Sequence, residues 1–354
     1  MTRRRPLGAT AAVVATVALV TLVGADPAAA DPPVPTDYRS TVDTIEPAAA
    51  GVGAEVVGGD AFLELTVDRG LEVVVTGYQG EPYLRFRPDG TVQRNRRSPA
   101  TYVNDSRDAV AQVPASADPE ADPEWETVAD GGAYAWHDHR IHWMGSERPD
   151  GAEPGEWTKA WTVDIEVDGT PARIHGTLAL ADGVNPLPWL ALGLAVAAAV
   201  VIAGRRRPLV VASVGALVAA ALATGVGWAQ RADAPAGSGV NPLLVAVPLA
   251  GVAAAGLGLT VGRRLGRQAL APMTLAAAAA VAGWGVLRLD VLSKPVLPTV
   301  LDAGLDRAGT TLALALAVAS AGLVVWGSGL VVPDDHENES KTGAAATVAG
   351  GDRR

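Results

Sequence analysis

Long apolar stretches fill the second half of the chain. Residues 187–332 hold five of them, each about 20 residues long, which is the length that a helix needs to cross a hydrocarbon core. The five stretches are residues 187–204, 208–228, 242–262, 269–289 and 310–332. Their length and composition predict an α-helical transmembrane bundle of five spans, with the lipid bilayer as its partner.

The first half of the chain follows a different pattern. Residues 61–67 and 161–167 alternate apolar and polar side chains, which is typical of strands with one buried face. Asp168 and Gly169 follow the second run, and an Asp-Gly pair favours a tight hairpin turn. Short alternating runs joined by such turns predict an all-β, sandwich-like domain over residues 31–186. We therefore expect a mixed fold class, in which this β domain precedes the transmembrane bundle.

The N-terminus has the pattern of an export signal. Arginines stand at positions 3–5, residues 8–25 are apolar and uncharged, and alanines stand at positions 28–30. A positive start, a short apolar middle and small residues at the exit predict a secretory signal peptide over residues 1–30. The alternative is an uncleaved first transmembrane helix. Either segment would carry the β domain out of the cell.

The arginines between the apolar stretches predict the orientation in the membrane. They occupy positions 205–207 in one connection and 263, 264 and 267 in another, so they fall on alternate connections. Cytoplasmic loops are enriched in Arg and Lys, which places both connections inside. The β domain then lies outside a multi-pass plasma-membrane protein. The polar segment 333–354 is expected to be a disordered cytoplasmic tail.

Composition excludes several classes of protein. The 354 residues include no Cys, which rules out a disulfide scaffold, a thiolate metal site and a thiol enzyme. A formal net charge of -10 argues against a nucleic-acid partner, which would require a basic face. No ionisable residue falls in the middle of a predicted span, which argues against a pump or proton-coupled transporter.

Residues 136–144 form the densest chemical cluster, because they hold three of the five His. Imidazole binds copper and zinc, and a Met thioether favours Cu(I), so copper is the cofactor to consider. The candidate ligands are His137, His139, His142, Met144 and, from another strand, His175. On a straight strand His137 and His139 share one face, so a site of three His requires a bend before His142. The alternative is a core strand whose polar side chains bond to their neighbours.

A basic cluster follows the strand predicted near residues 83–87. Arg94, Arg96 and Arg97 could hold an anionic group or a partner through bidentate contacts. Alternatively, they pair with nearby Asp and Glu and fix the loop. No nucleophile elbow or phosphate-binding Gly loop accompanies them, so we expect no enzymatic activity.

Residues 77–86, 95–102 and 136–144 carry a resemblance to a family of uncharacterised multi-pass membrane proteins of high-GC Gram-positive bacteria. The resemblance implies an exported domain and a helical membrane part, without implying an activity. The architecture is also loosely similar to copper-handling envelope proteins, in which a β-sandwich with His and Met is joined to membrane helices. The chain departs from those proteins at Asp31, which would follow signal cleavage where they have a His.

Together these features predict a multi-pass protein of the cell envelope with an extracytoplasmic binding or assembly domain and no enzymatic activity. Its protein partner would be another envelope protein or a second copy of the chain. The alternative is a copper-binding or copper-handling protein that uses the ligands between His137 and Met144.

Overall fold

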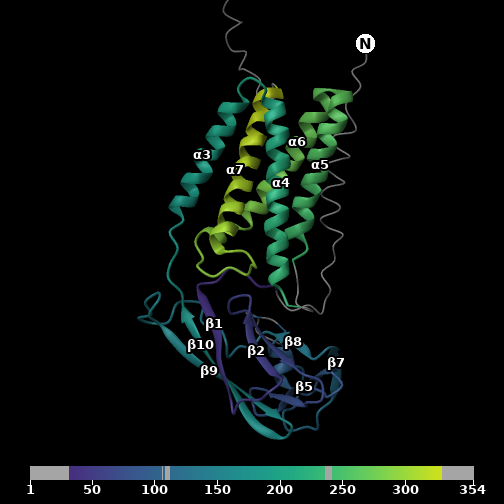
Figure 1. Cartoon of the computed structure of the whole chain (residues 1–354), viewed down its shortest axis with the longest axis vertical. Helices are drawn as coiled ribbons and strands as arrows, with labels where there is room; N and C mark the ends of the chain where they lie inside the picture. Colours follow the sequence, from purple (N-terminus) through teal and green to yellow (C-terminus); the bar gives the residue numbers. More distant parts are fainter. Residues whose placement is uncertain (1–31, 106, 108–111, 236–240, 329–354) are drawn as a thin grey trace, which may run out of the picture.

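The computed structural model describes residues 32–105, 107, 112–235 and 241–328, which form a β-sheet domain followed by a helical region (Figure 1). The signal peptide expected over residues 1–30 and the tail expected over residues 333–354 lie outside the described residues. The two kinds of apolar pattern along the sequence therefore correspond to two structurally different parts.

The larger sheet, counted over the described residues, has seven strands, and every neighbouring pair is antiparallel. In sheet order they are β1 (Tyr38–Glu46), β10 (Thr170–Leu180), β9 (Thr158–Val167), β4 (Val73–Thr76), β5 (Pro82–Phe86), β6 (Val92–Asn95) and β7 (Trp125–Ala129). The predicted Asp-Gly hairpin joins β9 to β10. Asp168 and Gly169 take φ angles of 47° and 77°, which a two-residue turn of this kind requires.

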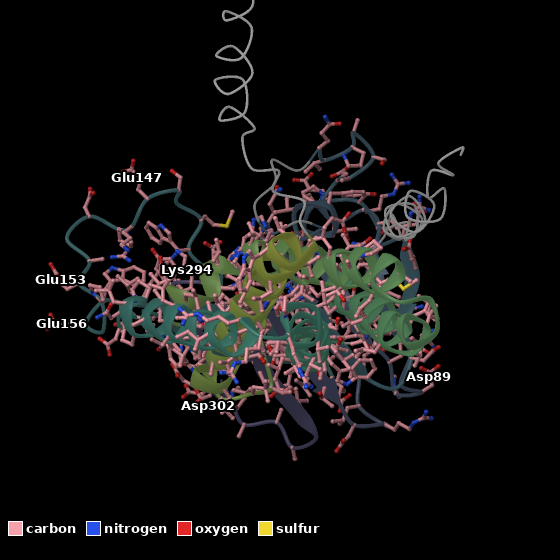
Figure 2. The ribbon with its side chains drawn as sticks, turned by 90° about the horizontal axis from the view of Figure 1, so that it is seen from above. Asp89, Glu147, Glu153, Glu156, Lys294 and Asp302 are labelled. Atoms are coloured by element: carbon pink, nitrogen blue, oxygen red, sulfur yellow. The ribbon has the colours of Figure 1, made fainter. Side chains whose placement is uncertain are left out.

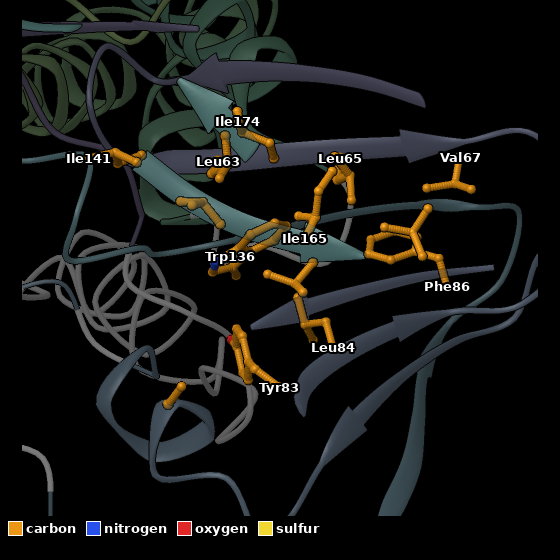
Figure 3. Close-up of a cluster of buried hydrophobic side chains, with 14 of the residues drawn as sticks. Leu63, Leu65, Val67, Tyr83, Leu84, Phe86, Trp136, Ile141, Ile165 and Ile174 are labelled. Atoms are coloured by element: carbon orange, nitrogen blue, oxygen red, sulfur yellow. The ribbon is translucent and has the colours of Figure 1, made fainter. Parts of the chain in front are cut away.

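A second sheet, of three described strands, places β3 (Phe62–Val67) between β2 (Val52–Val57) and β8 (Ala133–Trp136). The hydrophobic core of the domain takes side chains from both sheets. Leu63 and Leu65 come from β3, and Leu84 and Phe86 come from β5 (Figure 3). All four are fully buried, so the β domain has one shared core.

Five helices in the described part of the chain are long and apolar enough to cross a membrane. They are α3 (Leu187–Gly204), α4 (Pro208–Asp233), α5 (Leu243–Leu265), α6 (Arg267–Val286) and α7 (Ala303–Ser328). The number and order of the helices agree with the five apolar stretches of the sequence. Helix α3 stands apart from the other four in Figure 1 and is the least buried of the five.

Helix α7 begins at Ala303, earlier than the apolar stretch that starts at residue 310. Asp302 accounts for the early start, because its carboxylate accepts hydrogen bonds from the Gly304 and Leu305 amides, at 2.8 and 3.4 Å. The first two turns of α7 therefore carry Asp306 and Arg307, both of them buried. The predicted span over residues 310–332 did not include these two residues.

The β domain contacts one end of the helical region. Thr36 and Val296 exchange two backbone hydrogen bonds, at 3.0 and 3.1 Å, and the Lys294 ammonium lies 2.8 Å from the Asp37 carboxylate. The connections α3–α4 and α5–α6, which carry the arginine clusters, lie at the opposite end (Figure 1). Seen along the long axis, Glu147, Glu153 and other acidic residues lie at the periphery (Figure 2).

Candidate functional site

The segment 136–144 is not a continuous strand. Strand β8 ends at Trp136, and the chain then turns, with the Ile141 amide donating to the Asp138 carbonyl at 3.0 Å. The prediction that His137 and His139 share the face of a strand was therefore wrong. The Asp138 carboxylate explains the turn, because it accepts a hydrogen bond from the Arg140 amide at 3.0 Å and so competes with the sheet ladder.

Asp138 and Arg140 form an ion pair at the centre of this turn, in which the carboxylate is buried and the guanidinium is half-buried. The Asp138 carboxylate is fully buried and receives the Arg140 Nε and Nη2 groups at 2.8 and 2.7 Å. Trp136 Nε1 donates to the same carboxylate at 2.9 Å. Burial alone would raise the pKa of the Asp138 carboxyl, but the charge and hydrogen bonds of Arg140, together with the Trp136 hydrogen bond, hold this pKa below its usual value.

Tyr78 connects this turn to another part of the sequence. Its hydroxyl accepts a hydrogen bond from the His139 amide at 2.9 Å and donates to the Asn104 side chain. The Arg140 guanidinium lies over the Tyr78 ring, 5.0 Å from the centroid. Burial raises the pKa of the Tyr78 hydroxyl, so the neutral phenol persists as a hydrogen-bond donor.

Glu81 connects segment 77–86 to segment 95–102. It is buried, and it accepts hydrogen bonds from the Ser98 hydroxyl at 2.7 Å and the Gln79 amide at 2.9 Å. Asn95 donates to the Pro82 carbonyl at 2.7 Å. The three segments that carry the resemblance, 77–86, 95–102 and 136–144, are thus joined by buried polar contacts.

The three His of the turn have separate environments. His137 is fully buried, stacks on Phe62 with a centroid distance of 4.2 Å, and has its Nδ1 2.6 Å from the Ala61 carbonyl. This contact makes Nδ1 the protonated nitrogen, because a carbonyl can only accept. The rings of His139 and His142 lie 5.2 Å apart, centroid to centroid.

His142 is the most unusual polar side chain of the turn. Its side chain is 1% exposed, and within the described residues neither ring nitrogen has a hydrogen-bond partner. Burial lowers the pKa of His142 to about 3, and the neighbouring charge of Arg107 acts in the same direction. The imidazole is therefore neutral at physiological pH.

The remaining candidate ligands lie elsewhere. Met144 is 52% exposed, and His175 lies in β10, opposite Thr162 of β9 and Thr44 of β1. No group of three or more His, Asp or Glu suited to a metal ion occurs in the part of the chain that the structure describes. The structure therefore brings His139 and His142 close together but does not assemble the five predicted ligands into one site.

Two residues near this turn, the buried Asp60 and the half-buried Arg107, were not singled out from the sequence. The Asp60 carboxylate is fully buried and lies 2.8 Å from the guanidinium of Arg107. Asp60 follows two glycines and Arg107 belongs to an acidic, polar stretch, so both resemble surface residues in sequence. Only the fold, which buries the loop before β3, shows that they form a pair.

The arginines after β5 pair with acidic side chains. Arg94 contacts Asp105 at 3.1 Å and Glu126 at 3.2 Å. Arg96 and Arg97 lie 3.0 and 3.2 Å from the carboxylate of Glu124, which immediately precedes β7. This is the pairing expected if these arginines fix the loop, and it leaves less of their charge for an external anion.

Comparisons of the chain with protein-family models, with curated proteins and with solved structures gave no match. The functional argument therefore depends on the geometry described above.

Proposed function

We propose that the protein is a multi-pass membrane protein of the cell envelope, whose β domain serves outside the cytoplasm as a non-enzymatic binding or assembly module. The observation that carries this proposal is the contact of an acidic β domain with one end of five apolar helices, at the end away from the arginine-bearing connections. Cytoplasmic connections are enriched in Arg, so this arrangement supports an external β domain.

The finer description of the β domain is part of the same proposal. A core that draws side chains from a seven-stranded and a three-stranded sheet supports a sandwich-like arrangement. In such a domain the strands form a rigid support and the loops between them meet a partner. The exposed acidic loop that includes Glu147 and Glu153 offers such a surface (Figure 2).

The contacts of the candidate residues support a function other than catalysis. The buried Asp138 carboxylate is neutralised by Arg140, and the Glu81 carboxylate accepts hydrogen bonds from its own neighbours. A catalytic acid or base must reach the proton that it transfers on a substrate. Buried groups whose hydrogen bonds are already made hold loops in place instead.

The absence of Cys from the sequence allows a direct test of the topology. Two single-cysteine variants, Asp150→Cys in an exposed loop of the β domain and Arg206→Cys between α3 and α4, provide matched positions. In intact cells a membrane-impermeant maleimide should label the first variant, and it should label the second only after permeabilisation. Labelling of the second variant in intact cells would overturn the proposed orientation.

One observation favours a metal-binding function: the rings of His139 and His142 lie close together. The ring nitrogens of His142 make no hydrogen bond within the described residues. Titration of the purified full-length protein with Cu(I), Cu(II) and Zn(II) tests this function. Binding tighter than about 1 mM that disappears in the His139→Ala/His142→Ala variant would support a metal site. Weaker binding would exclude it.

A further inference from the structure

A large cavity lies between the helices beside the β domain. It has a volume of about 1180 Å³, and its walls come mainly from α5 and α6. The lining residues of α6 begin at Pro272 and continue to Leu287, just past the end of the helix. At 1.5 Å per residue this is a length of about 22 Å, which makes the cavity an elongated channel.

The walls of the cavity are apolar along most of this length. Leu243 and Val247 of α5 face it from one side, and Leu275, Ala279 and Trp284 of α6 from the other. Pro248 interrupts the backbone hydrogen bonds of α5, and the Leu244 carbonyl accepts instead from the Trp284 indole at 3.0 Å, so this backbone group in the wall has a partner. The walls therefore offer an acyl chain the environment that it has in a bilayer.

The polar lining residues gather at the end nearest the β domain. Gln230, Asn241, Arg288 and Asp290 line the cavity there. Arg288 follows the end of α6, and its side chain is 6% exposed. Its guanidinium contacts the Asp306 carboxylate at 2.7 Å and the Gln230 amide oxygen, while its Nε has no hydrogen-bond partner in the described chain.

The charges around this end favour an anion. The buried charged side chains of the described helical region are Arg288, Arg307 and Asp306, and the Asp306 carboxylate pairs with Arg288. Asp290 also lines this end of the cavity, but its side chain is exposed, so water screens its charge. Arg307 donates to the backbone carbonyls of Val291 and Lys294, at 3.1 and 2.7 Å, and these neutral groups do not compensate its charge. A buried guanidinium with an unused donor requires an acceptor, and an anionic oxygen is the strongest one available.

We propose that this cavity binds an anionic phospholipid, with an acyl chain along α5 and α6 and the headgroup oxygens at Arg288. A single apolar channel with a cationic polar end matches the two parts of such a molecule. The inference rests on the membrane location proposed above, and it names the ligand class of a site in the helical part of the protein. No bond is made or broken in this binding step.

The experiment measures lipids retained by the purified full-length protein in native mass spectrometry, after delipidation and addition of a chosen probe. The probes are phosphatidylglycerol, phosphatidylcholine with the same chains, and oleate. The wild type should retain one phosphatidylglycerol, with about a tenfold or greater preference over phosphatidylcholine. Equal retention of the two phospholipids, a preference for oleate, or a lipid-free dimer would each overturn the proposal, and none of these outcomes requires a variant.

Two variants locate the site. Ala279→Trp fills the channel, and Ala253→Trp is its matched control, because Ala253 is exposed on α5 and does not line the cavity. Only the first should lose phosphatidylglycerol. The double variant Arg288→Met/Asp306→Leu removes the buried pair without leaving a lone charge, and it should lose the headgroup preference. Retention by Ala279→Trp, or an unchanged preference in the double variant, would contradict the assignment even if the cysteine labelling confirms the topology.

Discussion

Lowering the pH from about 7.5 to about 5 should destabilise the β domain through one buried imidazole, that of His142. An imidazole in an unfolded chain has a pKa of about 6.5, whereas burial lowers the pKa of folded His142 to about 3. Between these two values the unfolded chain binds a proton that the folded chain does not bind. The contribution of His142 to stability is therefore complete above about pH 6.5 and falls as the pH falls.

The size of the effect follows from the same two pKa values. About 1.5 pH units lie between the pKa of the unfolded chain and pH 5, and each unit corresponds to about 1.4 kcal/mol, so His142 costs about 2 kcal/mol at pH 5. With a urea m-value of about 2 kcal/mol/M, the unfolding midpoint should fall by about 1 M. His142→Leu replaces the imidazole by an apolar side chain and should remove this part of the pH dependence.

The assay is urea unfolding of the full-length protein in detergent micelles, followed by near-ultraviolet circular dichroism at both pH values. This signal reports on the β domain, because all the Tyr and Phe and five of the nine Trp lie there. Ile141→Val is the matched control: it removes a methyl group from a buried neighbour and should lower the free energy of unfolding equally at both pH values, by about 1 kcal/mol. If wild type and His142→Leu lose the same stability between pH 7.5 and 5, His142 is not the acid-sensitive group and the reasoning fails.

Three further substitutions test the packing of the β domain. Arg140→Met leaves the buried Asp138 carboxylate without its counter-charge, so the free energy of unfolding at neutral pH should fall by about 3–5 kcal/mol; a fall below about 1 kcal/mol in urea unfolding would contradict a buried pair. Gly176→Ala places a methyl group 2.0 Å from the Trp161 ring and 2.4 Å from the Thr41 carbonyl oxygen, and should cost about 1–3 kcal/mol by the same assay; an unchanged stability would contradict this close packing. Arg96→Ala removes ion pairs of a half-exposed side chain and should cost less than about 1 kcal/mol; a larger loss would show that this pairing is not a surface contact.

The elements that the sequence predicted well are those determined locally. The five apolar stretches correspond to α3–α7 because helix formation in such stretches depends on composition over about 20 residues. The β9–β10 hairpin follows from Asp168 and Gly169, which tolerate positive φ. The start of α7 was missed because it depends on one capping side chain, Asp302, rather than on hydropathy.

The candidate site was less accessible to sequence analysis because buried polar contacts connect residues far apart in the chain. Alternation predicted a strand through His139, but the Asp138 carboxylate turns the chain, and residue type alone does not show where a carboxylate will bond. The pairing of Arg94, Arg96 and Arg97 was foreseeable as one alternative, because acidic residues outnumber basic ones in this domain. The Asp60–Arg107 pair has no sequence pattern that would reveal it.

The junction between the β domain and the helices joins the cavity to the exported part of the protein. Gln230 contacts both parts: its amide nitrogen donates to the Pro33 carbonyl at 3.5 Å, and its oxygen accepts from Arg288. Pro33 also lines the cavity, and it precedes by three residues the Thr36–Val296 backbone bridge. A headgroup oxygen at the Arg288 Nε would leave the Gln230 and Asp306 contacts of this guanidinium in place. The proposed lipid site is therefore connected through Arg288 and Gln230 to the segment that precedes the β domain.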